Sequence, residues 1–202
     1  MTWCSSPEEK GAFFMKISTR QIAIASALAA LSTVVQLIHI GYQSPTWGMW
    51  IDIVSVTWVV AYFIFGLRIS ILVSLLGAGM ISLFAPETWL GASMKLVATL
   101  PIIIMISGWT IIRKKRIDWY VKPLHLLVPL LIGIIVRCLV VLPLNYYYAI
   151  PIWTGMTPSM AMKAIPWFVI AAFNSIQSII DVIFAWIIVY VFKINRFSND
   201  ST

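Results

Sequence analysis

Long apolar stretches, separated by short polar segments, make up most of this chain. Six of them are expected to cross a membrane as helices, with bounds near 21–40, 50–65, 69–84, 92–112, 123–145 and 164–192. A helix needs about 20 apolar residues to cross a hydrocarbon core about 30 Å thick. The second and third stretches are short for this, so their ends must thin the bilayer or lie within the bundle. The pattern predicts an all-α integral membrane protein with six transmembrane helices.

Composition supports the membrane assignment and narrows the class of partner. Hydrophobic residues make up 61% of the 202-residue chain and charged residues only 10%, which is too little polar surface for a soluble domain. The net charge is +7. Because the basic residues lie at the ends of the apolar stretches, anionic lipid headgroups explain this charge better than nucleic acid does.

The positions of Lys and Arg predict an orientation. Eleven of the fourteen precede the first stretch, join the second to the third or the fourth to the fifth, or follow the sixth. Lys and Arg accumulate on the cytoplasmic side, so both termini are predicted to be cytoplasmic in a multi-pass protein of the plasma membrane. Residues 1–16 and 194–202 are the predicted tails, with Met15 as an alternative start, and 17–193 form the membrane domain. The outward loops are rich in Trp and Tyr, for which an interfacial belt is favoured over ligand contact.

Several chemistries have no matching motif in the sequence. It contains no HExxH, no GxSxG and no Walker-type Gly-rich loop with Lys and Ser or Thr. His39 and His125 are predicted on opposite sides of the membrane, and no Cys or His cluster has metal-ligand spacing. An enzyme is therefore disfavoured, neither a metal nor a cofactor is expected, and the chain has no means to hydrolyse ATP by itself.

The sixth apolar stretch carries a polar and aromatic stripe. Asn174, Gln177 and Asp181 are spaced at i, i+3 and i+7, which places them on one helix face. Trp167 and Lys163 fall on the same face. Lipid offers no hydrogen-bond partner to an amide or a carboxylate, so we expect the stripe to face the bundle interior or a water-filled cavity.

Depth along the helices predicts a polar pocket that opens to the outside. A rise of about 1.5 Å per residue places Arg137 and Asn174 in one layer, whereas Asp181 lies deeper and is assigned to a separate role. Together with Trp167, the residues expected to contact a ligand in this outer half are Asp52, Lys95, Arg137, Asn145, Asn174 and Gln177.

Other roles stay open for these side chains. Asp52 and Lys95 fit interfacial charges or a structural ion pair as well as they fit contact with a ligand. Asn174 and Gln177 also fit interhelical hydrogen bonds, worth about 0.6 kcal/mol each. Arg137 lies too deep to reach an interface easily, so a buried partner or an anionic ligand is favoured.

The first apolar stretch contains small residues four apart. Ala23 pairs with Ala27 and Ala25 with Ala29, which gives a flat strip that another helix can approach closely. Internal packing is the simpler interpretation of this strip. Its predicted place in the cytoplasmic half also suits the docking of a partner subunit from the cytoplasmic side.

In these features the sequence resembles the substrate-binding S component of energy-coupling factor (ECF) vitamin transporters, and among them the riboflavin-type branch. The resemblance extends over 15–192. It rests on the six-helix layout, the alanine strip, the segment GASMKLVATLP at 91–101 and the segment 165–177. The order of these features along the chain carries the resemblance more than any one of them.

The family implies a division of labour. Its S component captures a vitamin from outside, and a separate membrane coupling subunit with two ATPase subunits drives release inward; the alanine strip docks on the coupling subunit. In riboflavin-type members a helix-six Asn and a Lys three residues later contact the flavin. Asn174 matches that Asn, and Asn145 matches an Asn of helix five. Gln177, however, stands in place of the Lys. The change replaces a point charge by a neutral donor and acceptor, so the vitamin stays open among riboflavin and similar ringed compounds.

Three functions are compatible with the sequence. The leading hypothesis is substrate capture for an ATP-driven vitamin importer. The second is a self-sufficient ion-coupled transporter or a small channel, suggested by Asp52, Arg137 and Asp181 inside the membrane, although no internal repeat supports it. The third is a membrane scaffold without a ligand.

Overall fold

The first helix begins where the sequence supplies a cap. The Ser18 side chain accepts a hydrogen bond from the Gln21 N–H, and the Gln21 side chain accepts one from the Ser18 N–H. This reciprocal pair satisfies two backbone donors that a helix start otherwise leaves free. The helix, α1 (Thr19–Ile38), ends at His39 in the left-handed conformation. The chain then turns into a short antiparallel hairpin, in which Gly41 lies opposite Asp52.

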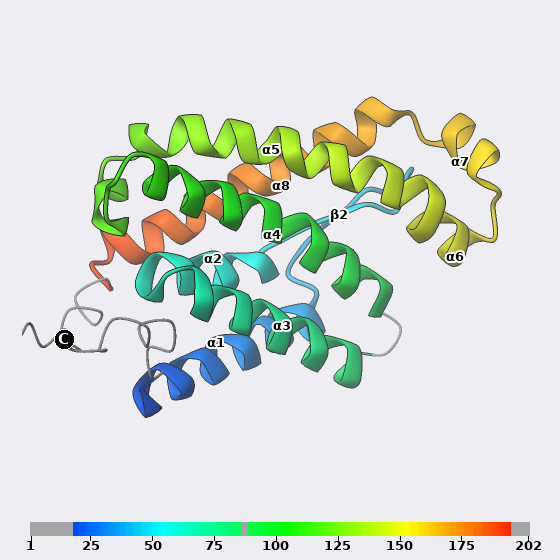
Figure 1. Cartoon of the computed structure of the whole chain (residues 1–202). Coiled ribbons are helices and arrows are strands. Elements are labelled where there is room, and N and C mark those ends of the chain that lie inside the picture. Colours follow the sequence, from blue (N-terminus) through cyan, green and yellow to red (C-terminus); the bar gives the residue numbers. More distant parts are fainter. Residues whose placement is uncertain (1–17, 86–88, 195–202) are drawn as a thin grey trace, which may run out of the picture.

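The computed structural model describes residues 18–85 and 89–194, and these are almost entirely helical (Figure 1). The predicted tail 1–16 and nearly all of 194–202 lie outside the described residues. After the hairpin, formed by β1 (Gly41–Gln43) and β2 (Trp50–Asp52), the elements in chain order are α2 (Val54–Phe65), α3 (Leu67–Phe84), α4 (Trp89–Ile112), η2 (Ile117–Val121), α5 (Leu124–Leu144), η3 (Asn145–Ala149), α6 (Ile150–Thr154), α7 (Pro158–Ala164), α8 (Trp167–Trp186) and η4 (Ile187–Val191).

Five helical segments in the described residues are long and apolar enough to cross a membrane: Thr19–Ile38, Leu67–Phe84, Trp89–Ile112, Leu124–Thr154 and Trp167–Val191. The membrane class and the helical fold are therefore as predicted. The expected span 50–65 differs, because its first residues form β2 and the helix that follows, α2, has only 12 residues. At about 1.5 Å per residue, α2 is too short to cross a bilayer by itself.

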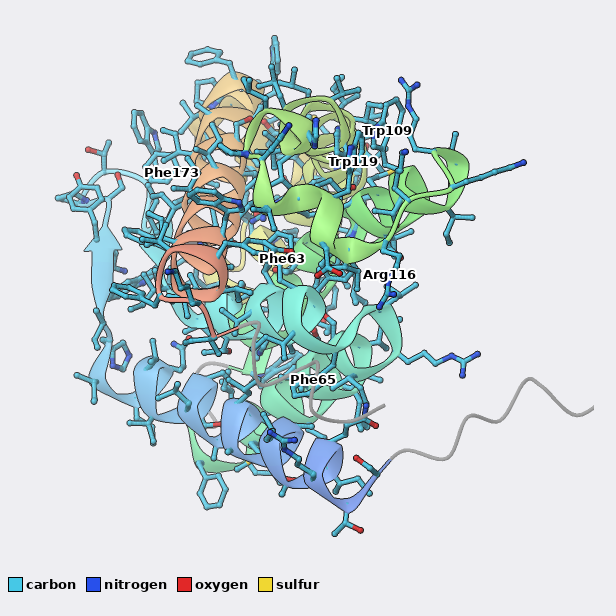
Figure 2. All side chains as sticks on the ribbon, turned by 90° about the vertical axis from the view of Figure 1, so that its left-hand side faces the viewer. Phe63, Phe65, Trp109, Arg116, Trp119 and Phe173 are labelled. Atoms are coloured by element: carbon cyan, nitrogen blue, oxygen red, sulfur yellow. The ribbon has the colours of Figure 1, made fainter. Side chains whose placement is uncertain are left out.

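The helix α2 is the centre of the bundle. Every residue from Val54 to Ile64 is buried, and the helix contacts α1, α3, α4 and α8. Phe63 packs against the rings of Tyr120 and Tyr190, with centroids 6.2 and 5.5 Å away. Figure 2 shows Phe63 near the middle of the bundle and Arg116 at its edge. A helix that is apolar all round is expected to be surrounded by protein, which is what α2 shows.

The predicted span 164–192 also differs from the structure. It begins three residues early, because α7 ends at Ala164 and α8 starts only at Trp167. The break falls at Ile165 and Pro166. A residue before proline is disfavoured in the helical conformation, so the chain turns there. Lys163 therefore lies on a different helix from Asn174, and the predicted stripe does not extend to it.

Basic residues gather at one end of the bundle. The start of α1, the turn between α4 and α5, and the end of η4 all lie on the left in Figure 1, whereas α6 and α7 lie on the right. The left-hand end carries Arg20, Arg113, Lys114, Lys115, Arg116, Lys122 and Lys193. The fold thus separates a basic end from the end at which the hairpin and α6 meet.

A glycine allows the close approach of α1 to α3. A Cβ atom at Gly77 would lie 2.6 Å from Oγ of Ser32 and 2.8 Å from Nε1 of Trp58. We expect Gly77→Ala to lower the free energy of unfolding by about 1–3 kcal/mol, because Trp58 is fully buried and has little room to move. Unfolding of purified protein in detergent measures this change.

The same helix offers a matched control for that substitution. A Cβ at Gly79 would meet nothing within 4 Å. We expect Gly79→Ala to leave stability unchanged or to raise it slightly, since alanine favours the helix by about 1 kcal/mol over glycine. Equal effects of the two substitutions would contradict the packing argument.

Candidate functional site

A cavity of about 460 Å³ lies between the hairpin and the ends of four helices, away from the basic end of the bundle. Its walls come from the end of α1, the hairpin, the start of α4, the segment from α5 to α6, and the middle of α8. Six of the seven residues predicted to contact a ligand line it: Asp52, Lys95, Arg137, Asn145, Asn174 and Gln177. The topology thus brings together residues that are far apart in sequence.

Trp167 is the exception among the predicted contact residues. Its side chain is 63% exposed and does not line the cavity. Ile170, one turn further along the same face of α8, is fully buried. In the first turn of α8, Val169 and Ile170 are buried whereas Trp167 and Phe168 are exposed, so the protein covers only one side of this turn. The prediction of Trp167 as a ligand contact is wrong for this structure.

The Gln177 side chain holds the end of the hairpin. Its Oε1 accepts the Asp52 N–H at 3.0 Å, and its Nε2 donates to the Asp52 carbonyl oxygen at 2.7 Å. The same nitrogen donates to Oδ1 of Asp181 at 2.8 Å. The amide thus pairs with the Asp52 backbone as a neighbouring strand would. Although Gln177 lines the cavity, its hydrogen-bonding capacity is taken up within the protein.

Asp52 is positioned by its hydrogen bonds to Gln177 and in turn positions Lys95. Its Oδ1 accepts the Val54 N–H at 3.0 Å at the start of α2. Its Oδ2 forms an ion pair with the Lys95 ammonium. Both carboxylate oxygens therefore have partners. The ion pair considered for Asp52 and Lys95 is present, and both residues also line the cavity. Lys95 keeps two further N–H donors at the cavity wall.

Arg137 and Asn174 form the second half of the polar layer. Arg137 Nε donates to Oδ1 of Asn174 at 3.0 Å, so the two residues share one layer, as depth predicted. Asn174 Nδ2 donates to the Ile170 carbonyl oxygen at 2.9 Å. Behind them, Oδ2 of Asp181 lies 3.9 Å from Nη1 of Arg137. Asp181 is therefore linked to Arg137 and Gln177, and its assignment to a separate role is corrected.

We call Asp52, Lys95, Arg137, Asn174, Gln177 and Asp181 the polar network. Four of these side chains are ionic, with two acids and two bases, so their formal charges cancel. Charges buried in a low-dielectric interior are retained only when paired in this way. The network forms a polar floor beneath a cavity whose walls are mostly apolar.

Aromatic rings make up much of the remaining wall. Trp47, Trp50, Trp89 and Trp153 come from three connections at this end of the fold, and Phe173 comes from α8. From sequence, an interfacial belt was favoured over ligand contact as the role of these tryptophans. Their grouping in three loops that were predicted to lie on the same side of the membrane was the available signal, but sequence alone did not show that the loops converge. Such rings offer flat apolar surfaces for a ringed ligand.

Comparisons with known proteins were made at the level of sequence and of structure. No family model and no curated protein matches the sequence. The structure is similar to one described as the S component of a bacterial ECF transporter, with a TM-score of 0.65 and 22% sequence identity. The match covers 89% of this chain and 96% of that one. The chain has the S-component fold.

The S-component fold confirms the predicted resemblance at the level of architecture. The riboflavin-type branch stays a prediction, because the likeness concerns the arrangement of helices and not the ligand. In this fold the cavity is lined by the segment 91–101, through Lys95 and Ala98, and by 165–177, through Asn174 and Gln177. These are the two segments on which the sequence resemblance rested.

The alanine strip of α1 is split between the interior and the surface. Ala25 and Ala29 are fully buried, in the core that α1 shares with α2 and α3. Internal packing, the simpler interpretation, therefore applies to these two, and their prediction as residues that dock a partner is corrected. Ala23 and Ala27 are exposed. Docking of a partner at this helix stays a prediction for those two residues only.

Proposed function

We propose that this chain is the substrate-binding membrane subunit of an ECF-type importer. It captures a vitamin or related ringed molecule, riboflavin or a similar compound, in the cavity between the hairpin and α8. A coupling subunit and two ATPase subunits supply the energy for uptake. The observation that carries the proposal is the cavity itself, in which a polar floor from α4, α5, α8 and β2 meets tryptophans from three loops.

The size and lining of the cavity support a small-molecule ligand. Sites for such ligands have volumes of about 300–1,000 Å³, with mostly apolar walls and a few placed polar groups. The cavity, at about 460 Å³, falls in this range. We propose that its mouth faces the outside of the cell, since the basic end of the bundle is then cytoplasmic.

Ligand binding by the purified chain tests this function. We expect one of riboflavin, thiamin, biotin or pantothenate, or a molecule that copurifies, to bind with one-to-one stoichiometry in calorimetry. Asn174→Ala is expected to weaken that binding about tenfold, because it removes the acceptor that orients Arg137. Trp167→Phe, outside the cavity, is the matched control on the same helix and is expected to leave affinity unchanged.

Two results would contradict the proposal. The first is a protein that binds none of these compounds and carries no small molecule on purification. The second is uptake into liposomes by this chain alone, driven by a proton or sodium gradient. That second outcome would favour the ion-coupled transporter instead.

A further inference from the structure

Arg137 lines the cavity and has an unpaired hydrogen-bond donor. The residue is 4% exposed, yet its Nη1 has no hydrogen-bond partner among the described residues. The nearest acid, Asp181, lies 3.9 Å away at Oδ2, which is beyond hydrogen-bond distance. An unpaired donor of a buried charged group is costly unless another molecule accepts from it. Because Arg137 lines the cavity, its guanidinium group can donate to a ligand there.

Each side-chain oxygen of Asp52, Gln177 and Asn174 already has a hydrogen-bond partner, whereas Oδ2 of Asp181, a residue that does not line the cavity, has none among the described residues. Oδ1 of Asp52 accepts from Val54, and Oδ2 is paired with Lys95. Gln177 Oε1 accepts from the Asp52 N–H. Asn174 is engaged in the same way, since its Oδ1 accepts from Arg137 Nε. Among the members of the polar network that line the cavity, the groups with unused hydrogen-bonding capacity are therefore the N–H donors of Lys95 and Arg137.

The charge of the floor limits the charge of the ligand. The two acids and two bases of the polar network cancel before any ligand enters. Among the described residues, a cation at the cavity wall would meet only the carboxylate of Asp52, whose two oxygens already have partners. An anion would add an uncompensated charge to a buried layer, and such a charge is unfavourable unless paired.

We propose that the cavity selects an uncharged, flat-ring ligand whose buried edge offers carbonyl oxygens or ring nitrogens to Arg137 and Lys95. The inference rests on the proposed function of small-molecule capture and adds the chemical class of the ligand. Tryptophans of the three loops pack against the faces of the ligand ring, while Arg137 and Lys95 donate hydrogen bonds to its edge. Gln177 does not bind the ligand, because its amide is hydrogen-bonded to the backbone of Asp52.

A panel of probes that differ in charge tests the inference. We expect the purified chain to bind the neutral rings lumichrome or pterin at least tenfold more tightly than it binds pterin-6-carboxylate or the cation thiamin. Calorimetry or ligand-induced thermal stabilisation in detergent measures these affinities. A wild-type preference for the carboxylate or for thiamin would overturn the inference and leave the proposed function intact.

Variants of the buried pair test the part assigned to Arg137. The double substitution Arg137→Gln and Asp181→Asn removes one charge of each sign, so the floor stays neutral. We expect it to weaken binding of the neutral rings about 10- to 100-fold, because a charged donor is lost. Asp181→Asn alone leaves one excess positive charge, and we expect it to shift the preference toward pterin-6-carboxylate. The control, Leu139→Ala, lies on α5 with a side chain that is 68% exposed.

Each outcome of this experiment has a defined meaning. A folded double variant that binds lumichrome or pterin like the wild type would overturn the role of Arg137. A preference unchanged by Asp181→Asn would overturn the charge argument, while the wild-type panel still reports on ligand class should that variant fail to fold. If no probe and no molecule from a cell extract binds, the proposed function and this inference fail together.

Discussion

Replacing Asp181 with leucine is expected to lower the free energy of unfolding by about 3–5 kcal/mol, since it leaves the buried Arg137 guanidinium without an acid. Asp181 is 1% exposed and also accepts a hydrogen bond from Gln177. Its removal therefore takes a partner from a cation and from an amide at once. Unfolding of the purified protein, followed in detergent by circular dichroism, measures the loss.

The double variant Arg137→Leu and Asp181→Leu is the control for this prediction. It removes both charges, and replacing a buried ion pair by apolar residues is often neutral or stabilising. We expect it to recover most of the stability lost in Asp181→Leu. If the single and double variants are equally unstable, the loss does not come from an unpaired charge.

Gln177→Leu is expected to lower the free energy of unfolding by about 2–4 kcal/mol, because it leaves the backbone N–H and carbonyl of Asp52 without the hydrogen-bond partners that Gln177 supplies. The hairpin then loses its hydrogen bonds to α8. We expect faster hydrogen–deuterium exchange in peptides that cover Gly41–Asp52, measured by mass spectrometry on the folded protein. This readout separates a released hairpin from a general loss of packing.

A second substitution on α8 provides the comparison. The Ser175 hydroxyl donates to the Ala171 carbonyl oxygen within the same helix, four residues earlier. We expect Ser175→Ala to leave exchange in the hairpin unchanged. Protection of the hairpin that survives in Gln177→Leu would show that Asp52 is held by other contacts.

Much of the polar floor could be predicted from sequence because lipid gives polar groups no partner. The spacing of Asn174, Gln177 and Asp181 was enough to predict that they share one helix face. The rise of the helix per residue placed Asn174 at the same depth as Arg137. The structure confirms that Arg137 and Asn174 are hydrogen-bonded. Length also indicated that the second apolar stretch is short for a transmembrane helix, although it was counted as one of the six spans.

The roles of the polar residues were harder to predict than their positions. Spacing cannot show that the amide of Gln177 pairs with a backbone 125 positions earlier in the chain. Asp181 was assigned elsewhere because depth was counted between backbones, whereas an arginine side chain reaches about one helical turn. Trp167 was misplaced because periodicity gives a direction around the helix axis and not the extent of the neighbouring elements.

The alanine strip shows a different limit of sequence reasoning. Small residues four apart indicate that a helix approaches closely, and Ala25 and Ala29 are fully buried as that rule requires. The rule does not say whether the approaching helix belongs to the same chain. Here α1 contacts α2 and α3, so the buried pair serves the fold itself.

The buried pair between α5 and α8 imposes an order on biosynthesis. Arg137 is synthesised and delivered to the membrane before Asp181, because α6, α7 and most of α8 follow it in the chain. An arginine at the centre of an inserting helix costs about 2.5–3.5 kcal/mol, which the surrounding Leu, Ile and Val residues of α5 offset. The nascent protein thus carries an unpaired cation until its last helix arrives. A ribosome that stalls before α8 would leave that cation exposed to the quality-control proteases of the membrane.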